Sequence, residues 1–219
     1  MATEDFSTYD ETDVSSRVTK TSDRVTHTAL DKDEEAHVSD SKGVGHFSGD
    51  FTHRFRMSFS ETQSGNPFCT VFAWAVSDVQ ETQYILDANG DSMLGFEIFG
   101  LNEYRIYLVE IDAGDFRPTS TARTLNLDTE YWCELSRSSS TYTYSVWSDD
   151  YEGTLVHTES LTLQTVTAYE YVYGLQSREE SGAGGKTTTG WLQFLDLLEA
   201  GGGNAMPMAA HHYEQQGIG

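Results

Sequence analysis

Residues 129–149, TEYWCELSRSSSTYTYSVWSD, decide the fold that we expect for this chain. Apolar and polar residues alternate on both sides of a serine-rich turn at 138–140, which is typical of two antiparallel strands with one buried face. The members of the apolar row are Tyr131, Cys133, Leu135, Tyr142, Tyr144 and Val146. The segment therefore predicts a β-hairpin that covers a hydrophobic core.

Short apolar or alternating runs recur along the rest of the chain and predict further strands. Their ranges are 24–30, 35–39, 51–60, 68–77, 93–100, 104–111, 169–176 and 190–198. One helix is expected over 78–88, with Asp78 as its N-cap. This pattern predicts an all-β chain, a two-sheet antiparallel β-sandwich with one short helix and an extended C-terminal tail.

The 219 residues suit one sandwich domain, which we expect over residues 1–200. Three consecutive glycines then begin a linker and tail, residues 201–219. The tail is too short and too polar to fold alone, so we expect it to bind a partner during assembly. Its expected contact residues are Met206, Pro207, Met208, Tyr213 and Ile218.

The chain is strongly acidic, with 13 Lys and Arg against 35 Asp and Glu and a net charge of −22. Such a charge repels phosphate backbones and anionic membrane surfaces, so no nucleic-acid partner is expected. A hydrophobic content of 37% indicates a folded acidic protein. Two interpretations stay open: an ordinary acidic surface, or adaptation to concentrated salt and a halophilic host.

No apolar run has the length of a membrane span, and the first residues, MATEDFSTYDETD, are acidic where a secretory signal is basic and then apolar. We therefore expect that the chain does not insert into a membrane. We also expect that it is made in a host cytoplasm without a signal peptide. Cys69 and Cys133 both fall in expected core strands, so two buried thiols are favoured over a disulfide.

Several short sequence segments follow one another in an order that indicates a known family. They are RVTHT at 24–28, DKDEEAHVSD at 31–40, GHFSGDFTHRF at 45–55, WAVSDVQETQYILDANGDS at 74–92, EIDAGD at 110–115 and TGWLQFLDLLE at 189–199. With the hairpin, this order resembles the laminin-G-like, concanavalin A-like jelly rolls found as virion structural proteins of tailed viruses. The resemblance covers nearly the whole chain and contains no catalytic signature.

The resemblance implies a non-enzymatic virion component, such as a capsid decoration, turret or tail protein. Its partners would be other virion proteins and identical subunits in a symmetric homo-oligomer, and its location would be the virion. An alternative is a lectin-like, carbohydrate-binding module that attaches to a host glycan. A glycoside hydrolase ranks behind both interpretations.

The hydrolase interpretation depends on Glu110, Asp112 and Asp115, which are similar to the E-x-D-x-x-E strand of retaining glucanases. The last acid is an aspartate here, and its shorter side chain after Gly114 would draw a proton donor back from the glycosidic oxygen. We therefore predict no catalytic residue, and a solvated acidic strand end instead.

The sequence offers only weak candidates for metal binding. Asp87, Asn89 and Asp91 resemble the first half of a calcium loop, but Ser92 replaces the turn glycine and Ile98 replaces the final glutamate. An Asn-Gly turn is the better interpretation, and the histidine spacings match no zinc motif. We expect no metal and no cofactor.

Two tryptophans of the hairpin are candidates for contact with a sugar. Trp132 and Trp147 fall on the side of their strands opposite the apolar row, where an indole ring could stack on a pyranose. The alternative is a second buried face, because central strands of a jelly roll are often covered on both sides.

Overall fold

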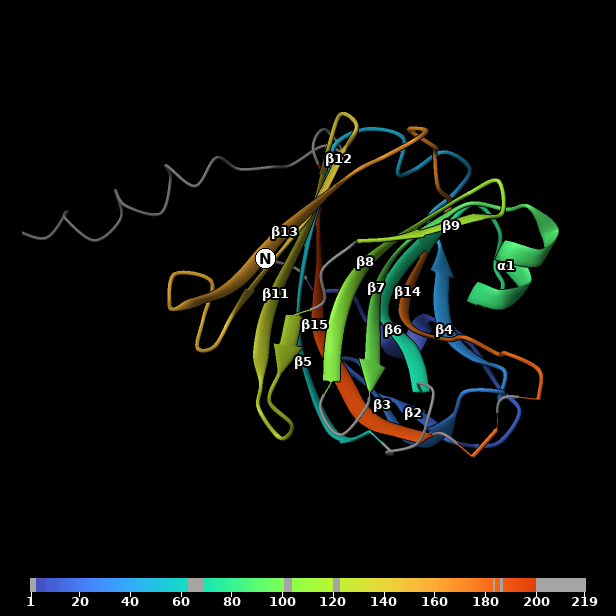
Figure 1. Cartoon of the computed structure of the whole chain (residues 1–219), viewed down its shortest axis with the longest axis vertical. Coiled ribbons are helices and arrows are strands. Elements are labelled where there is room, and N and C mark those ends of the chain that lie inside the picture. The colour runs from blue at the N-terminus through green and yellow to red at the C-terminus, as the bar shows by residue number, and fades with distance from the viewer. Residues whose placement is uncertain are drawn as a thin grey trace, which may run out of the picture.

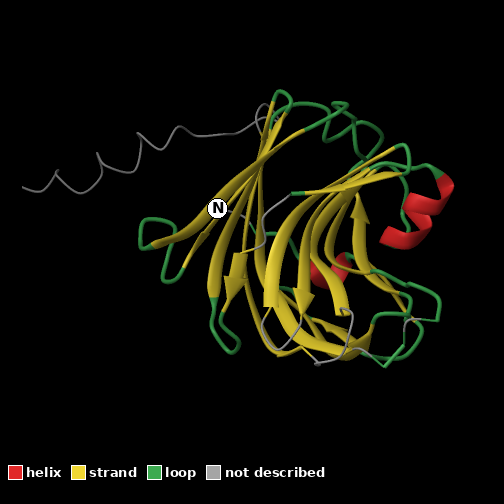
Figure 2. Ribbon diagram, in the orientation of Figure 1, coloured by secondary structure: helices red, strands yellow, loops and turns green. Residues whose placement is uncertain are grey.

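The computed structural model describes residues 3–62, 69–100, 104–119, 123–182, 184–185 and 187–199. Two antiparallel sheets face each other and enclose the core (Figures 1 and 2). The predicted two-sheet β-sandwich is therefore confirmed. Among the described residues, no helix is both long enough and apolar enough to cross a bilayer.

Sheet A runs in the order β1 (Asp10–Asp13), β4 (Ala36–Ser41), β14 (Tyr171–Ser177), β6 (Cys69–Ser77), β7 (Met93–Gly100), β8 (Tyr104–Asp112) and β10 (Arg123–Leu125). A further strand, β9 (Asp115–Pro118), also pairs with β8. A tight turn at Ala113 and Gly114, which both have positive φ, connects β8 to β9.

Sheet B runs in the order β13 (Leu155–Thr162), β12 (Thr141–Trp147), β11 (Tyr131–Ser138), β5 (Phe51–Thr62), β15 (Thr187–Glu199), β3 (Arg24–Asp31) and β2 (Val18–Lys20). The helical elements are a 3-10 turn (Phe6–Thr8) and α1 (Gln83–Asn89). The closing strand β15 lies between β3 and β5, so the last strand of the described chain is placed inside sheet B between two early strands.

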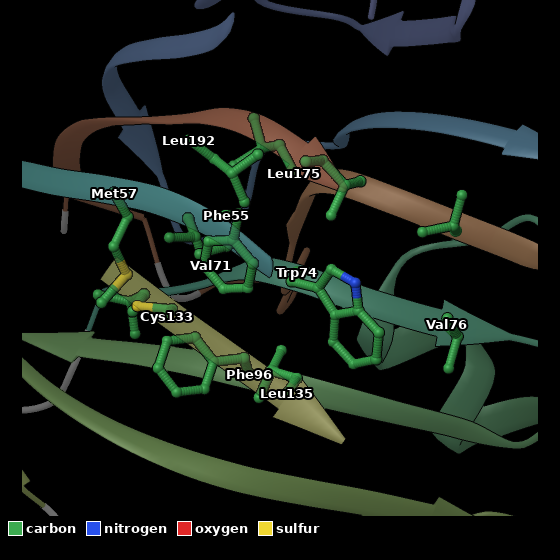
Figure 3. Packing of buried hydrophobic residues seen from close by; sticks show 14 of the residues in the cluster. Phe55, Met57, Val71, Trp74, Val76, Phe96, Cys133, Leu135, Leu175 and Leu192 are labelled. Carbon is green, nitrogen blue, oxygen red and sulfur yellow. The ribbon is translucent and has the colours of Figure 1, made fainter. Parts of the chain in front are cut away.

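The predicted hairpin is β11 and β12, with Cys133 opposite Val146 and Leu135 opposite Tyr144. Its apolar row is at most 3% exposed and faces sheet A. Figure 3 shows Cys133 and Leu135 packed toward Phe96 of sheet A. Cys133 is a free buried thiol, whereas the side chain of Cys69 lies outside the described residues.

A second apolar cluster covers part of the outer face of sheet A. Leu86 of α1 packs there with Phe72, Val109, Ile111 and Tyr173. Figure 1 shows α1 on the side of sheet A that faces away from sheet B. Both faces of β6 are therefore buried, which explains why its sequence is apolar without alternation.

The predicted helix 78–88 is wrong at its N-terminal end, because α1 begins at Gln83 with Thr82 as its N-cap. The Asp78 carboxylate accepts a hydrogen bond from the Ser92 amide instead of capping the helix. The Tyr173 hydroxyl donates to the carbonyl of Val79. These bonds hold the bent segment before α1 against sheet A.

Candidate functional site

The prediction of a solvated acidic strand end is wrong for Glu110 of β8, which is engaged inside the protein. Glu110 is 1% exposed, and its Oε2 lies 2.5 Å from Nη1 of Arg117. Both of its carboxylate oxygens also accept from the amide of Gln164, at 2.9 and 3.1 Å. Burial raises the pKa of Glu110, while the Gln164 amide and the Arg117 charge oppose that rise.

The two neighbouring acids contact the same loop. Thr165 donates from Oγ1 to Asp112 at 2.8 Å, and Gln164 donates from Nε2 to Asp115 at 3.3 Å. The three carboxylates therefore bind a turn that follows β13. Their hydrogen bonds are those of a structural junction between the two sheets.

The calcium candidates lie at the end of α1. Gly90 adopts a left-handed conformation, φ 81°, and caps the helix by donating to the carbonyl of Asp87. The amide of Asp91 donates to the carbonyl of Leu86. Among the described residues, no group of three His, Cys, Asp or Glu side chains is placed to hold a metal.

The outer face of sheet B carries a row of arginine and aromatic side chains. One cross-strand row runs directly across β3, β15, β5, β11 and β12, and its members are Arg24, Gln193, Arg56, Trp132 and Trp147. Arginine and aromatic side chains therefore share an outward face, where they can contact each other or a ligand.

The predicted pair Trp132 and Trp147 is brought together in this row, and both residues are half-buried. The Arg56 guanidinium lies 5.5 Å from the centre of the Trp132 ring. Trp147 makes an edge-to-face contact with Tyr151, with ring centres 5.7 Å apart. Other side chains of the protein therefore already cover part of the surface of each indole ring.

A polar pocket of about 360 Å³ lies beside this row on the same face. Trp191 lines it and stands directly between Thr26 of β3 and Ser58 of β5. The remaining lining residues are Ser60, Asp128, Glu130, Thr189 and Gly190. The pocket thus combines an indole ring with hydroxyls and carboxylates from four separate stretches of the chain.

Strand β15 has a β-bulge between Thr189 and Gly190, and both residues line the pocket. A Cβ at Gly190 would lie 2.6 Å from Cδ1 of Phe59 and 2.7 Å from the carbonyl oxygen of Ser58. Only glycine lets β15 approach β5 so closely. Gly190 therefore lets β15 pack closely against Phe59 of the core, while the neighbouring Trp191 lines the pocket on the outer face.

Asp128 lies at the edge of the pocket in a left-handed conformation, φ 55°. Its amide donates to the carbonyl of Phe59 at 2.8 Å, which fixes the turn against β5. Glu130 accepts from Nη1 of Arg56 at 2.8 Å and from Nε2 of Gln193 at 3.4 Å. The turn before β11 thus supplies two carboxylates, and one of them is already paired with a cation.

Sequence reasoning missed Trp191, Ser58 and Asp128. The available signal was the Gly190-Trp191 pair in the closing strand, because a glycine inside a strand often marks a bulge. The predicted tail contacts Met206, Pro207, Met208, Tyr213 and Ile218 lie outside the described residues.

No family model and no curated protein sequence matches this chain. Among solved structures it is similar to a Saccharomyces cerevisiae protein of unknown function, with a TM-score of 0.55, 14% identity, and coverage of 90% of this chain and 100% of that one. It is also similar to the family 7 alginate lyase A1-II′, with a TM-score of 0.54, 9% identity, and coverage of 81% and 80%. A third similar structure is the basic winged bean lectin, with a TM-score of 0.50, 10% identity, and coverage of 80% and 87%.

These likenesses define the class of protein by its fold, a concanavalin A-like jelly roll. The same architecture occurs in a lectin and in a lyase among these similar structures. The fold alone therefore does not indicate whether the protein binds a ligand or catalyses a reaction, and the function must be inferred from the site.

Proposed function

We propose that this chain is a non-enzymatic structural protein of a tailed-virus particle, a capsid decoration, turret or tail component that acts through protein-protein contacts. The observation that carries the non-enzymatic part is the engagement of Glu110, Asp112 and Asp115 by the loop at 164–165 and by Arg117. The order of the sequence phrases from residue 24 to residue 199 supports the viral part.

Catalysis by this strand would need two carboxyl groups on opposite sides of a bound sugar, one as nucleophile and one as acid. Glu110 cannot approach a substrate while it is 1% exposed and bonded to Arg117 and to the Gln164 amide. Asp112 and Asp115 bond to the same turn, so the acids support the loop and leave no pair for double displacement.

The net charge of −22 supports a role on the surface of a particle in salt water, because screening by concentrated salt reduces self-repulsion. In this proposal the sandwich is the exposed body, and the segment 201–219 contacts identical subunits or other virion proteins. Many symmetric copies would strengthen a small contact of this kind by avidity.

A second candidate is a lectin-like module for host attachment. The observation that favours it is the outer face of sheet B, where tryptophans, arginines and a polar pocket lie side by side. This role is compatible with a place in the virion, since a surface protein can both assemble and bind a glycan.

Removal of residues 201–219 tests the structural role. The shortened protein should keep the melting temperature of the full chain, because the linker glycines separate the tail from β15 in sequence. It should lose self-association in light scattering, and mass spectrometry should no longer find it in particles assembled by the virus that encodes it.

A full-length control in which residues 204–219 are replaced by a glycine-serine segment of equal length separates chain length from specific contact, and it should fail in the same way. Incorporation of either variant at the level of the natural chain would contradict assembly through the tail. Absence of the natural chain from purified particles would overturn the virion role.

A further inference from the structure

We infer that the pocket beside Trp191 on the outer face of sheet B binds one neutral pyranose unit of a glycan. The inference goes beyond the proposed structural role, because it assigns a ligand class to a defined pocket in the isolated chain. It is also distinct from stacking on Trp132 and Trp147, whose rings contact Arg56 and Tyr151.

Trp191 can serve as the apolar platform. The Arg24 guanidinium lies 4.5 Å from the centre of its ring and covers one face. Arg24 is held there because its Nε donates to Oε1 of Gln193 at 2.9 Å. Trp191 also lines the pocket, where its indole can pack against the C–H groups of a sugar ring.

The pocket also presents polar groups that can bind sugar hydroxyls. Within the described part of the chain, the side chains of Thr26, Ser58, Ser60 and Asp128 make no hydrogen bond, nor does Nε1 of Trp191. Hydroxyls can donate and accept, whereas the carboxylate accepts from two neighbouring hydroxyls at once. A polyol therefore matches this set better than an apolar ligand does.

These groups are held on rigid elements. Thr26, Trp191 and Ser58 lie opposite one another on three paired strands of sheet B. Asp128 is fixed by the bond from its amide to the carbonyl of Phe59. A ligand would therefore meet groups that are already in place, which lowers the entropy cost of binding.

The charge of the pocket selects for a neutral sugar. Asp128 and Glu130 line it, while the nearest arginines are directed at Gln193 and Glu130. Carboxylates of uronic or sialic acids would meet like charges here, in a protein whose net charge is already −22. Acidic glycans should therefore be rejected.

The size of the pocket fits a single ring. Its volume of about 360 Å³ lies near the lower limit of small-molecule pockets, which span roughly 300–1,000 Å³. Thr189, Gly190 and Trp191 line one side of this space, next to the β-bulge of β15. Ser60 is exposed, so the rest of a glycan chain can leave the pocket past this residue.

The test is direct binding by the full-length chain. Lactose, maltose, cellobiose and methyl α-mannoside are titrated by calorimetry, together with 3′-sialyllactose and digalacturonate as anionic counterparts, after a glycan array has ranked neutral and anionic glycans. We expect at least one neutral glycan to bind and its anionic counterpart to bind at least about tenfold more weakly. Binding of no neutral glycan, or a preference for anionic glycans, would overturn the inference.

Three substitutions locate the site. Asp128→Asn keeps a residue that tolerates the left-handed conformation but removes the charge, and Trp191→Ala removes the platform. Each should weaken the affinity by at least about tenfold while the melting temperature of Asp128→Asn stays that of the natural chain. Ser160→Ala is the matched control, because it removes an exposed hydroxyl of β13, at the edge of the same sheet, where it is bonded to Thr143.

Glycan binding that survives both Trp191→Ala and Asp128→Asn would place the site elsewhere and contradict the inference. Failure of glycan binding leaves particle incorporation untouched, and failure of incorporation leaves glycan binding untouched. The inference and the proposed structural role can therefore fail independently.

Discussion

Arg137 shows how a single charged residue completes the core of the sandwich. It continues the inward row of β11, is 1% exposed, and donates to the carbonyls of Phe47 at 2.6 Å and Thr167 at 2.8 Å. Its Nε also donates to the carbonyl of Gly49 at 3.0 Å. Strand β11 therefore supplies a buried cation that binds two loops, where an apolar residue would leave carbonyls unsatisfied.

His27 is a buried residue whose environment changes its pKa. It is 1% exposed in the core beside Phe59, with ring centres 5.5 Å apart. Burial lowers its pKa from 6.5 to about 3. In the described structure its Nε2 is buried without a hydrogen-bond partner, so the ring is accommodated only in its neutral form.

His27 should make the fold sensitive to acid. Above about pH 6.5 the ring is neutral in both states and contributes no pH dependence. Below that pH the unfolded chain binds a proton and the folded chain does not until about pH 3. The free energy of unfolding therefore falls by up to about 1.4 kcal/mol per pH unit through this group.

Chemical denaturation at pH 7, 6, 5 and 4 measures the effect. His27→Leu should reduce the loss of stability between pH 6.5 and pH 4, because leucine binds no proton. His46→Gln is the control, since it replaces an exposed histidine. If His27→Leu and the natural chain lose stability in parallel, the buried histidine is not the source.

At the scale of elements, the sequence predicted the strands whose residues alternate or are continuously apolar. It missed the short strands β1, β2, β9 and β10, because three or four residues contain too little pattern to detect. It also missed β13, where none of the eight residues is fully buried and no apolar row forms. The start of α1 was misplaced because tertiary bonds to Asp78 and Val79 outweigh the capping preference.

Only the part of the candidate site that lies on the β11–β12 hairpin could be predicted from the sequence. Alternation places Trp132 and Trp147 outward without any knowledge of neighbouring strands. The Trp191 pocket requires β15 to insert between β3 and β5 with a bulge at Gly190, and that pairing joins residues far apart in sequence. No local pattern specifies such a juxtaposition.

The junction at the end of β8 gives a prediction for that element. Glu110→Gln should destabilise the fold by roughly 1–3 kcal/mol, because Arg117 loses its charged partner and the Gln164 amide loses a carboxylate acceptor. The unfolding midpoint in urea measures this change. Asp115→Asn is the control, since Asp115 is exposed and makes one longer bond, and it should change stability little.

The natural chain and Glu110→Gln also test whether the acids at the end of β8 are catalytic. Neither the natural chain nor Glu110→Gln should hydrolyse β-glucans at any pH. Turnover by the natural chain that disappears in Glu110→Gln, with the fold intact, would show that the strand end is catalytic and would contradict the non-enzymatic proposal.

On the scale of the whole molecule, the excess of acidic residues dominates the electrostatics. Many of the basic side chains already form ion pairs, such as Lys32 with Glu180 at 2.6 Å, Lys42 with Glu4 at 2.6 Å and Arg54 with Glu134 at 2.6 Å. With 35 acids and 13 bases, acidic residues outnumber basic residues by 22. Repulsion among these carboxylates therefore opposes the compact state.

Sodium chloride should raise the melting temperature, because it shortens the screening length from about 10 Å at 0.1 M to about 3 Å at 1 M. Screening also weakens the ion pairs, but exposed pairs contribute little to stability, so relief of repulsion among the excess carboxylates should prevail. Sodium chloride is preferred to sulfate, which strengthens hydrophobic burial whatever the charge. A double variant, Asp10→Asn with Glu152→Gln, removes two exposed carboxylates and should show a smaller rise with salt. A melting temperature that stays flat or falls between 0.1 and 1 M would mean that repulsion does not limit this fold, and the argument for a saline habitat would lose its physical basis.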